Sequence, residues 1–207
     1  EPIDASEPVS GVFFHGTNAK INNVQEIDPL GRGDFGALYG RGAYLTDDPS
    51  IASSYGKKGS VLTAKVHEAK LIDLDKPIPE DVGRVFASNV SKFLDPENLL
   101  TTSKGKKATG VQFFDNLNSE VGDIESSYFK DDIIPKLQEL GYDGYKHTGG
   151  ELIKGRSHNV LILWGGTPFM KGGVPGSIGR KLSDFVTPTS RPSIPSEKIL
   201  SRPGWAR

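Results

Sequence analysis

The chain has 207 residues, 25 of them glycine and 14 proline, a length and composition typical of one domain with long loops and extensions. Its 10 Phe, 6 Tyr and 2 Trp residues provide for a core, which excludes a disordered chain. A net charge of −1 argues against a general affinity for nucleic acid, and the lack of cysteine excludes disulfides, thiol catalysis and cysteine-ligated zinc.

The N-terminal half predicts short strands and one short helix. Residues 1–10 are polar and predict an N-terminal arm. Short apolar or β-branched runs predict the strands, and Asp48 followed by Pro49 predicts the start of the helix. The predicted strands are residues 11–15, 43–46, 60–66 and 70–74, the helix is residues 50–55, and residues 18–42 form a loop.

The second half adds longer helices and ends in a polar segment. Helical periodicity predicts helices, and Pro135 either weakens the last of them or marks its true start. The predicted helices are residues 79–94, 111–117 and 131–140, the strands are residues 145–147 and 160–164, and residues 101–110 form a basic loop. Residues 172–207, rich in Gly, Pro and Ser, predict an extended C-terminal arm suited to bind a partner. The fold class is therefore α+β.

Several classes of protein are not expected. No apolar run approaches the roughly 18 residues of a membrane span, and the N-terminus lacks the apolar core of a signal peptide, so we expect a soluble protein. The four histidines lack metal-ligand spacing, so we expect no metal. The chain begins at Glu1 and its one methionine is Met170, so we expect a processed product or a part of a larger polypeptide.

Two segments combine residues suited to nicotinamide riboside. His15 ends a predicted strand and can hydrogen-bond a sugar hydroxyl, while Gly16 lets a ligand approach the main chain, whose N–H and C=O groups can pair with a carboxamide. Tyr44 and Tyr55 lie eleven residues apart on either side of a turn. A helix directly after the strand would fold Tyr55 back beside Tyr44, so that the two rings grip a flat, cationic ring.

These segments, FHGT at residues 14–17 and GRGAYLTDDPSIASSYG at residues 40–56, resemble the His-Tyr-Glu type of ADP-ribosyltransferase. That group includes diphtheria toxin and the poly-ADP-ribose polymerases, and the chain looks most similar to mono-ADP-ribosyltransferase domains of phage and bacterial polyvalent or effector proteins. The downstream GSVLTAKVHEAKLIDLD and LGYDGYKH are similar as well. The resemblance implies an ADP-ribosyltransferase domain over residues 11–171, with two small antiparallel sheets around an NAD cleft.

The resemblance also implies the roles of individual residues. The expected NAD contacts are His15 with the nicotinamide-side ribose, Gly16 with the carboxamide, Tyr44 and Tyr55 with the nicotinamide ring, Thr17 near the rest of NAD, and Arg41 with the diphosphate. Tyr44 also belongs to the expected catalytic set.

The third catalytic position departs from the family pattern. A glutamate is expected directly before the last core strand, where it would hydrogen-bond the ribose and stabilise the cation that grows as nicotinamide leaves. Asn159 stands there instead, and the nearest carboxylate is Glu151 in the preceding loop. Either Glu151 reaches the ribose, or Asn159 occupies the position and the activity is weak or altered.

The sequence thus predicts an NAD-dependent mono-ADP-ribosyltransferase, with NAD as co-substrate, no metal, and a protein rather than a nucleic acid as acceptor. A toxin, effector or phage-delivered protein that acts in a host cytoplasm is the expected setting. Two alternatives remain open. One is NAD-dependent removal of a 2′-phosphate from RNA, which would need a more basic cleft. The other is a catalytically silent NAD-binding or structural module.

Overall fold

The structure of the protein is a computed structural model that describes residues 7–22, 24–31, 39–56, 59–90, 95–121, 129–150, 157–165 and 186–188. The strands are β1 (Val9–Thr17), β2 (Ala43–Thr46), β3 (Ser60–Ala69), β4 (Leu71–Asp73), β5 (Gly144–Gly149), β6 (His158–Leu163) and β7 (Val186–Pro188). The helices are the 3₁₀-helix η1 (Val24–Glu26), α1 (Pro49–Tyr55), α2 (Glu80–Val90), α3 (Pro96–Leu100), α4 (Gly110–Val121), the π-helix η2 (Phe129–Ile133) and α5 (Ile134–Glu139).

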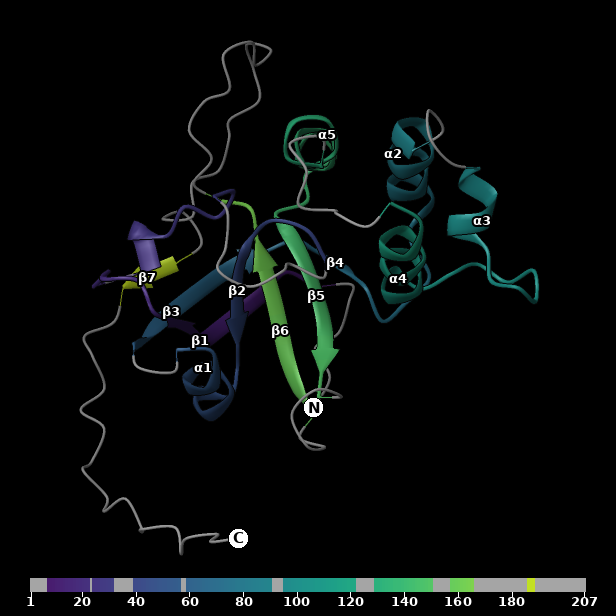
Figure 1. Cartoon of the computed structure of the whole chain (residues 1–207). Helices are drawn as coiled ribbons and strands as arrows, with labels where there is room; N and C mark the ends of the chain where they lie inside the picture. Colours follow the sequence, from purple (N-terminus) through teal and green to yellow (C-terminus); the bar gives the residue numbers. More distant parts are fainter. Residues whose placement is uncertain are drawn as a thin grey trace, which may run out of the picture.

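The described strands form one sheet of seven in the order β4-β5-β6-β2-β1-β3-β7 (Figure 1). Neighbouring strands are antiparallel except β4 and β5, which are parallel. Parallel strands need a long crossover, and the segment with α2 to α5 supplies it. The chain is therefore α+β, as predicted, but the expectation of two small antiparallel sheets is wrong.

The two halves of the sheet are nevertheless joined weakly. Between β1 and β2, both fully described, a single pair of residues is in register, Phe14 opposite Thr46. By contrast, β1 and β3 are in register over almost their whole length, and so are β2 and β6. This one pair turns the two expected sheets into one. From His15 to Thr17, the rest of β1 has no residue in register with β2, and the two strands separate there.

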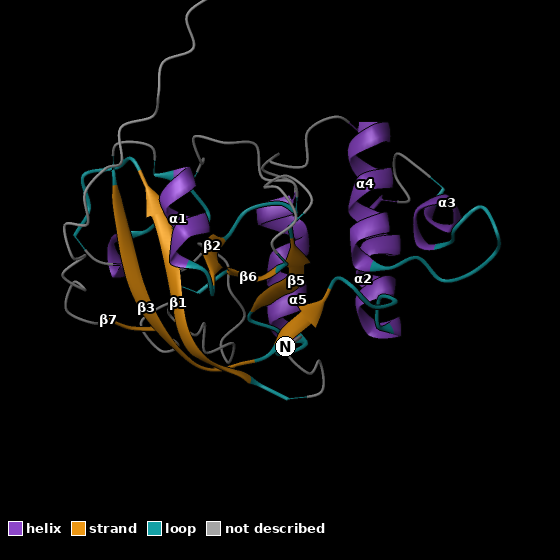
Figure 2. Ribbon diagram, turned by 90° about the horizontal axis from the view of Figure 1, so that it is seen from below, coloured by secondary structure: helices purple, strands orange, loops and turns teal. Residues whose placement is uncertain are grey.

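The larger core lies between the sheet and helices α2 to α5. Aromatic side chains dominate it: Phe86 of α2 stacks on Phe113 of α4 with ring centroids 4.4 Å apart, and Tyr145 of β5 meets Trp164 edge to face at 4.6 Å. A second core on the other strand faces contains no helical side chain except Val24 of η1. Figure 2 shows α1 apart from the other helices, beside β1 and β3.

Local signals located most elements within a few residues. The carboxylate of Asp48 accepts a hydrogen bond from the Ser50 N–H at 2.8 Å, which confirms the predicted cap of α1. The π-helix η2 runs directly into α5, and Pro135 stands in the first turn of α5, so the proline marks the change to α-helix and not the start of the helical segment. Helix α3 was not predicted, although Asp95 and Pro96 repeat the Asp-Pro start of α1.

The ends of the chain are described only in part. Strand β1 already begins at Val9, whose side chain is buried, so the last two residues of the predicted N-terminal arm belong to the sheet. Of the predicted C-terminal arm, β7 pairs with the outer edge of β3, with Thr187 opposite Lys65, and its other residues lie outside the described part. Within the described residues, the helices are too short or too polar to traverse a bilayer.

Candidate functional site

His15 lies at the opening between β1 and β2, which begins directly after the registered pair of Phe14 and Thr46. Its ring nitrogen Nδ1 lies 2.8 Å from the carbonyl oxygen of Tyr44, a group that an intact strand pair would bond to main chain. A carbonyl oxygen only accepts hydrogen bonds, so Nδ1 carries the proton and Nε2 of the neutral ring keeps a lone pair. The His15 side chain therefore connects the two strands across the opening, and its Nε2 atom can accept a hydrogen bond.

Burial keeps His15 in this neutral form. Desolvation lowers the pKa of His15 below its usual value, and the hydrogen bond to Tyr44 raises it by a smaller amount. A buried imidazole disfavours the charged form for lack of solvation. Near pH 7 the ring is therefore an uncharged hydrogen-bond acceptor at Nε2.

A pH dependence of stability follows from His15 and His147. Burial also lowers the pKa of His147, partly offset by the backbone of Thr148 and the charge of Asp75. The unfolded chain protonates both histidines near the usual value of about 6.5 and the folded chain only at lower pH. The unfolding free energy is thus complete above that value and declines as the pH falls through it towards the lower folded pKa values.

We expect the melting temperature to fall when the pH is lowered from about 7.5 to about 5.5. In the double variant His15→Gln, His147→Gln the fall should be shallower over the same interval. Differential scanning calorimetry checks both, and a melting temperature that is constant or rises on acidification would contradict the assignment.

Gly16 gives helix α1 its place on β1. A Cβ atom on Gly16 would overlap the carbonyl oxygen of Ala52 and lie 2.7 Å from its carbonyl carbon and 3.1 Å from the amide nitrogen of Gly56. The close approach that we expected of a ligand is thus made by the α1 backbone. The main chain of Gly16 has a registered partner in β3, Val61, and none in β2, both strands being fully described.

Tyr44 is held firmly on the larger core. Its hydroxyl donates to the carbonyl oxygen of Gly40 at 2.8 Å and accepts from the Tyr39 N–H at 3.3 Å. In the sheet it lies in one row with Ile162 and Tyr145, and burial, with a smaller contribution from Tyr44, raises the pKa of Tyr145 well above its usual value. Tyr44, one of the two tyrosines expected to contact the nicotinamide ring, is therefore held in a fixed position.

Tyr55 differs from Tyr44 in exposure. It lies in the last turn of α1, directly after β2 as predicted, and is 45% exposed. Because α1 packs beside Gly16, the helix carries this ring to the same end of β1 as His15. Part of the Tyr55 ring is therefore accessible to solvent at that end of β1.

Thr17 and Arg41 have structural partners. The hydroxyl of Thr17 accepts from the Ala19 N–H at 3.0 Å and closes the turn after β1. The guanidinium of Arg41 donates to the carbonyl oxygen of Leu30, eleven residues earlier, at 2.6 Å. These contacts account for both residues without a ligand.

Asn159 is bound to Asp47 at the end of β2. The Asn159 side-chain amide donates to one carboxylate oxygen at 2.6 Å, and its backbone N–H donates to the other at 2.9 Å. Asp47 N–H returns a bond to the Asn159 carbonyl at 3.2 Å. Glu151, the other candidate for the missing glutamate, lies outside the described residues. The structure thus adds a carboxylate that sequence analysis missed, because Asp47 was treated only as part of the turn before α1.

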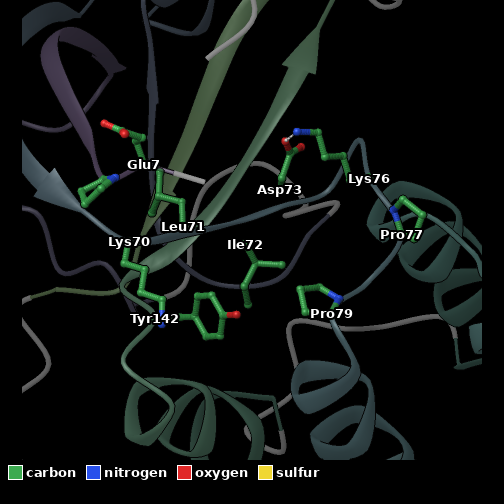
Figure 3. Close-up of a pocket in the computed structure, with 10 residues that line it drawn as sticks. Glu7, Lys70, Leu71, Ile72, Asp73, Lys76, Pro77, Pro79 and Tyr142 are labelled. Carbon is green, nitrogen blue, oxygen red and sulfur yellow. Dashed lines mark ion pairs between the residues drawn. The ribbon is translucent and has the colours of Figure 1, made fainter. Parts of the chain in front are cut away.

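A pocket lies elsewhere, at the β4 edge of the sheet (Figure 3). Three of its charged groups have partners within the protein: Lys70 Nζ lies 4.4 Å from the centre of the Tyr142 ring, and Asp73 lies 3.7 Å from both Lys76 and Lys146. Two of its lining residues, Glu7 and Pro8, stand directly before β1, at the end of that strand opposite to His15. The pocket is therefore separate from the opening at His15.

Neither a metal-binding group nor a related protein adds to the description of this site. Among the described residues, no three His, Asp or Glu side chains are grouped to hold a metal ion. Comparison of the chain with protein-family models, curated proteins and solved structures gives no match.

Proposed function

We propose that the protein is an NAD-dependent mono-ADP-ribosyltransferase that transfers ADP-ribose from NAD to a protein acceptor and releases nicotinamide. The observation that carries the proposal is the opening after Phe14, across which His15 bonds to the Tyr44 carbonyl. The sequence resemblance assigns the nicotinamide-side ribose to this same histidine. The proposal includes the ADP-ribosyltransferase fold and an effector or phage setting.

The groups around the opening fit NAD in their chemistry. The lone pair on His15 Nε2 can accept a hydrogen bond from a ribose hydroxyl. The exposed ring of Tyr55 can stack on the pyridinium, which gains cation–π attraction. The main chain of Gly16, with no β2 residue in register, is the candidate partner of the carboxamide.

In the proposed reaction, the bond between ribose C1′ and the nicotinamide nitrogen breaks, and its electron pair stays on the nitrogen. Positive charge then spreads over C1′ and the ring oxygen. The lone pair of the acceptor forms the new bond to C1′, and the acceptor proton passes to solvent. The protein's part is to hold the nicotinamide and the ribose at a fixed angle and to place negative charge near the ribose.

One alternative rests on a specific observation. Asn159 stands where the resemblance predicts glutamate, and its amide is engaged with Asp47. A neutral amide supplies no charge to the growing cation, which favours a silent NAD-binding module. Calorimetric binding of NAD without nicotinamide release over hours would support this second function.

The test of the proposed function is nicotinamide release from NAD. Wild-type protein should release nicotinamide, and His15→Ala and Tyr44→Ala should each lower the rate about 100-fold or more, since each removes part of the proposed donor site. His67→Ala, which changes an exposed histidine on β3, is the matched control and should leave the rate unchanged. No release by the wild type, or equal rates in all variants, would exclude the proposal.

A further inference from the structure

A carboxylate must stand near the ribose if this reaction is to be fast. The departing nicotinamide leaves a cation behind, and fixed negative charge stabilises that cation in the transition state. Asn159 is neutral, so the charge must come from another residue. The structure shows a carboxylate that is hydrogen-bonded directly to Asn159, that of Asp47.

Asp47 is oriented by Asn159 at two points. Its two carboxylate oxygens accept from the side-chain amide and the backbone N–H of Asn159, at 2.6 and 2.9 Å. With the return bond from Asp47 N–H to the Asn159 carbonyl, these bonds fix both the position and the plane of the carboxylate. An amide at residue 159 thus binds a carboxylate where a glutamate would have supplied one.

The charge of Asp47 is available for a ligand. Its side chain is exposed, and within the described residues no Lys, Arg or His nitrogen lies within ion-pair distance of it. The neighbouring Asp48 is engaged otherwise, since one of its oxygens accepts from the Ser50 N–H and hydroxyl at 2.8 and 2.6 Å. Asp48 is thus engaged at the start of α1, whereas Asp47 stands outside that cap with an exposed side chain and carries its charge there.

Asp47 lies close in the sheet to the opening at His15, across the Phe14–Thr46 pair from it. Asp47 follows β2 directly, three residues after Tyr44, whose carbonyl binds His15. By strand alternation, residue 47 points to the same face as residue 45, two residues or about 7 Å away along the strand. Since β1 and β2 are antiparallel and Phe14 stands opposite Thr46, His15 lies on the Leu45 side of this pair and Asp47 on the Phe13 side, about two residues apart along the strands.

We propose that Asp47 supplies the catalytic carboxylate of the ADP-ribosyl transfer and that Asn159 is its positioning residue. This inference rests on the proposed function. Asp47 contacts the nicotinamide-side ribose and stabilises the cation as the bond from C1′ to the nicotinamide nitrogen breaks. In the absence of an acceptor, water forms the new bond to C1′, its proton passes to solvent, and ADP-ribose is released.

The experiment compares nicotinamide release and NAD affinity in four proteins: wild type, Asp47→Asn, Asp48→Asn and Glu151→Gln. Asp47→Asn removes the charge at nearly constant shape, and we expect kcat to fall about 100-fold or more while the Kd for NAD changes about threefold at most. Asp48→Asn makes the same change one residue away and keeps a good helix cap, so it is the matched control and should leave kcat unchanged. Glu151→Gln tests the competing carboxylate, and its kcat is compared with that of Asp47→Asn.

A double variant tests the same idea by gain of activity. Asn159→Glu in the Asp47→Asn background returns a carboxylate to the other partner of the pair, and we expect kcat to recover about tenfold relative to Asp47→Asn alone. An active wild type with an unaffected Asp47→Asn variant, or a loss confined to Glu151→Gln, would overturn the role of Asp47 and leave the proposed function intact. A wild type without NAD turnover would instead overturn the proposed function and this inference with it.

Discussion

Replacing Gly16 by alanine is expected to lower the free energy of unfolding by about 3 kcal/mol. The added methyl group would overlap the carbonyl oxygen of Ala52 and lie 3.1 Å from the amide nitrogen of Gly56. Both atoms belong to the backbone of α1 and its cap, so no flexible side chain can move to make room. The helix must shift away from β1, and Ile51 and Ala52, which are buried beneath it, lose contacts.

Urea unfolding at 25 °C measures this effect, with Gly83→Ala as the control. Gly83 lies inside α2, where a Cβ atom would meet Ile78 at 3.9 Å and Leu100 at 4.0 Å, both ordinary contacts. Alanine is the better helix former, so Gly83→Ala should stabilise the protein by about 0.5–1 kcal/mol. If Gly16→Ala unfolds at the urea concentration of the wild type, the close packing of α1 on β1 is refuted.

The Gly16→Ala variant also bears on how function can be inferred from the motif. Gly16 precedes the strand end in a segment that suggests a ligand contact, yet the structure explains the glycine by the approach of α1. The displaced helix carries Tyr55, so we expect NAD affinity to fall in proportion to the shift. Loss of binding in this variant alone would therefore not prove a contact with Gly16, whereas loss in His15→Ala, at an unchanged melting temperature, would support direct binding.

Strands and helix starts were predicted well wherever the signal is local. Strand β2 has the predicted bounds because an apolar run stands between Gly42 and the Asp-Pro turn. The same Asp-Pro signal at Asp95 was missed because the helix that follows has only five residues, too few to show a period. Helix α3 was thus missed because it is short, although its Asp-Pro start signal is present.

The single sheet and the site geometry depend on pairings distant in sequence. One registered pair, Phe14 with Thr46, decides between one sheet and two, and no local pattern reports it. The bond of His15 Nδ1 joins residues 29 apart, and the Asp47–Asn159 pair joins residues 112 apart. Sequence analysis could name His15, Tyr44 and Asn159 as candidates but could not show that Asp47 is bonded to Asn159.

The buried ion pair between Asp73 and Lys146 predicts the second large stability effect. The two residues stand opposite each other in the parallel register of β4 and β5, with Nζ 3.7 Å from the carboxylate and side chains only 12% and 7% exposed. Asp73→Ala takes an ion-pair partner away from a lysine that is itself nearly buried, so this variant should lower the free energy of unfolding by about 3–5 kcal/mol. The variant also loses the bond from the Asp75 N–H to Asp73 at 3.0 Å.

Two lysine variants separate this charge effect from simple loss of an ion pair. Lys146→Met removes the ammonium and keeps the apolar stem in the core, while Asp73 keeps Lys76 and the Asp75 N–H as partners, so the loss of stability should be smaller than in Asp73→Ala, about 1–2 kcal/mol. Lys76→Met removes the other lysine on Asp73, which is 57% exposed, and should cost less than about 1 kcal/mol. Urea unfolding of the three variants gives the order. If Asp73→Ala and Lys76→Met lower the free energy of unfolding equally, the ammonium of Lys146 must be solvated in the folded protein. Only a desolvated ammonium would make the loss of Asp73 more costly than the loss of an exposed lysine.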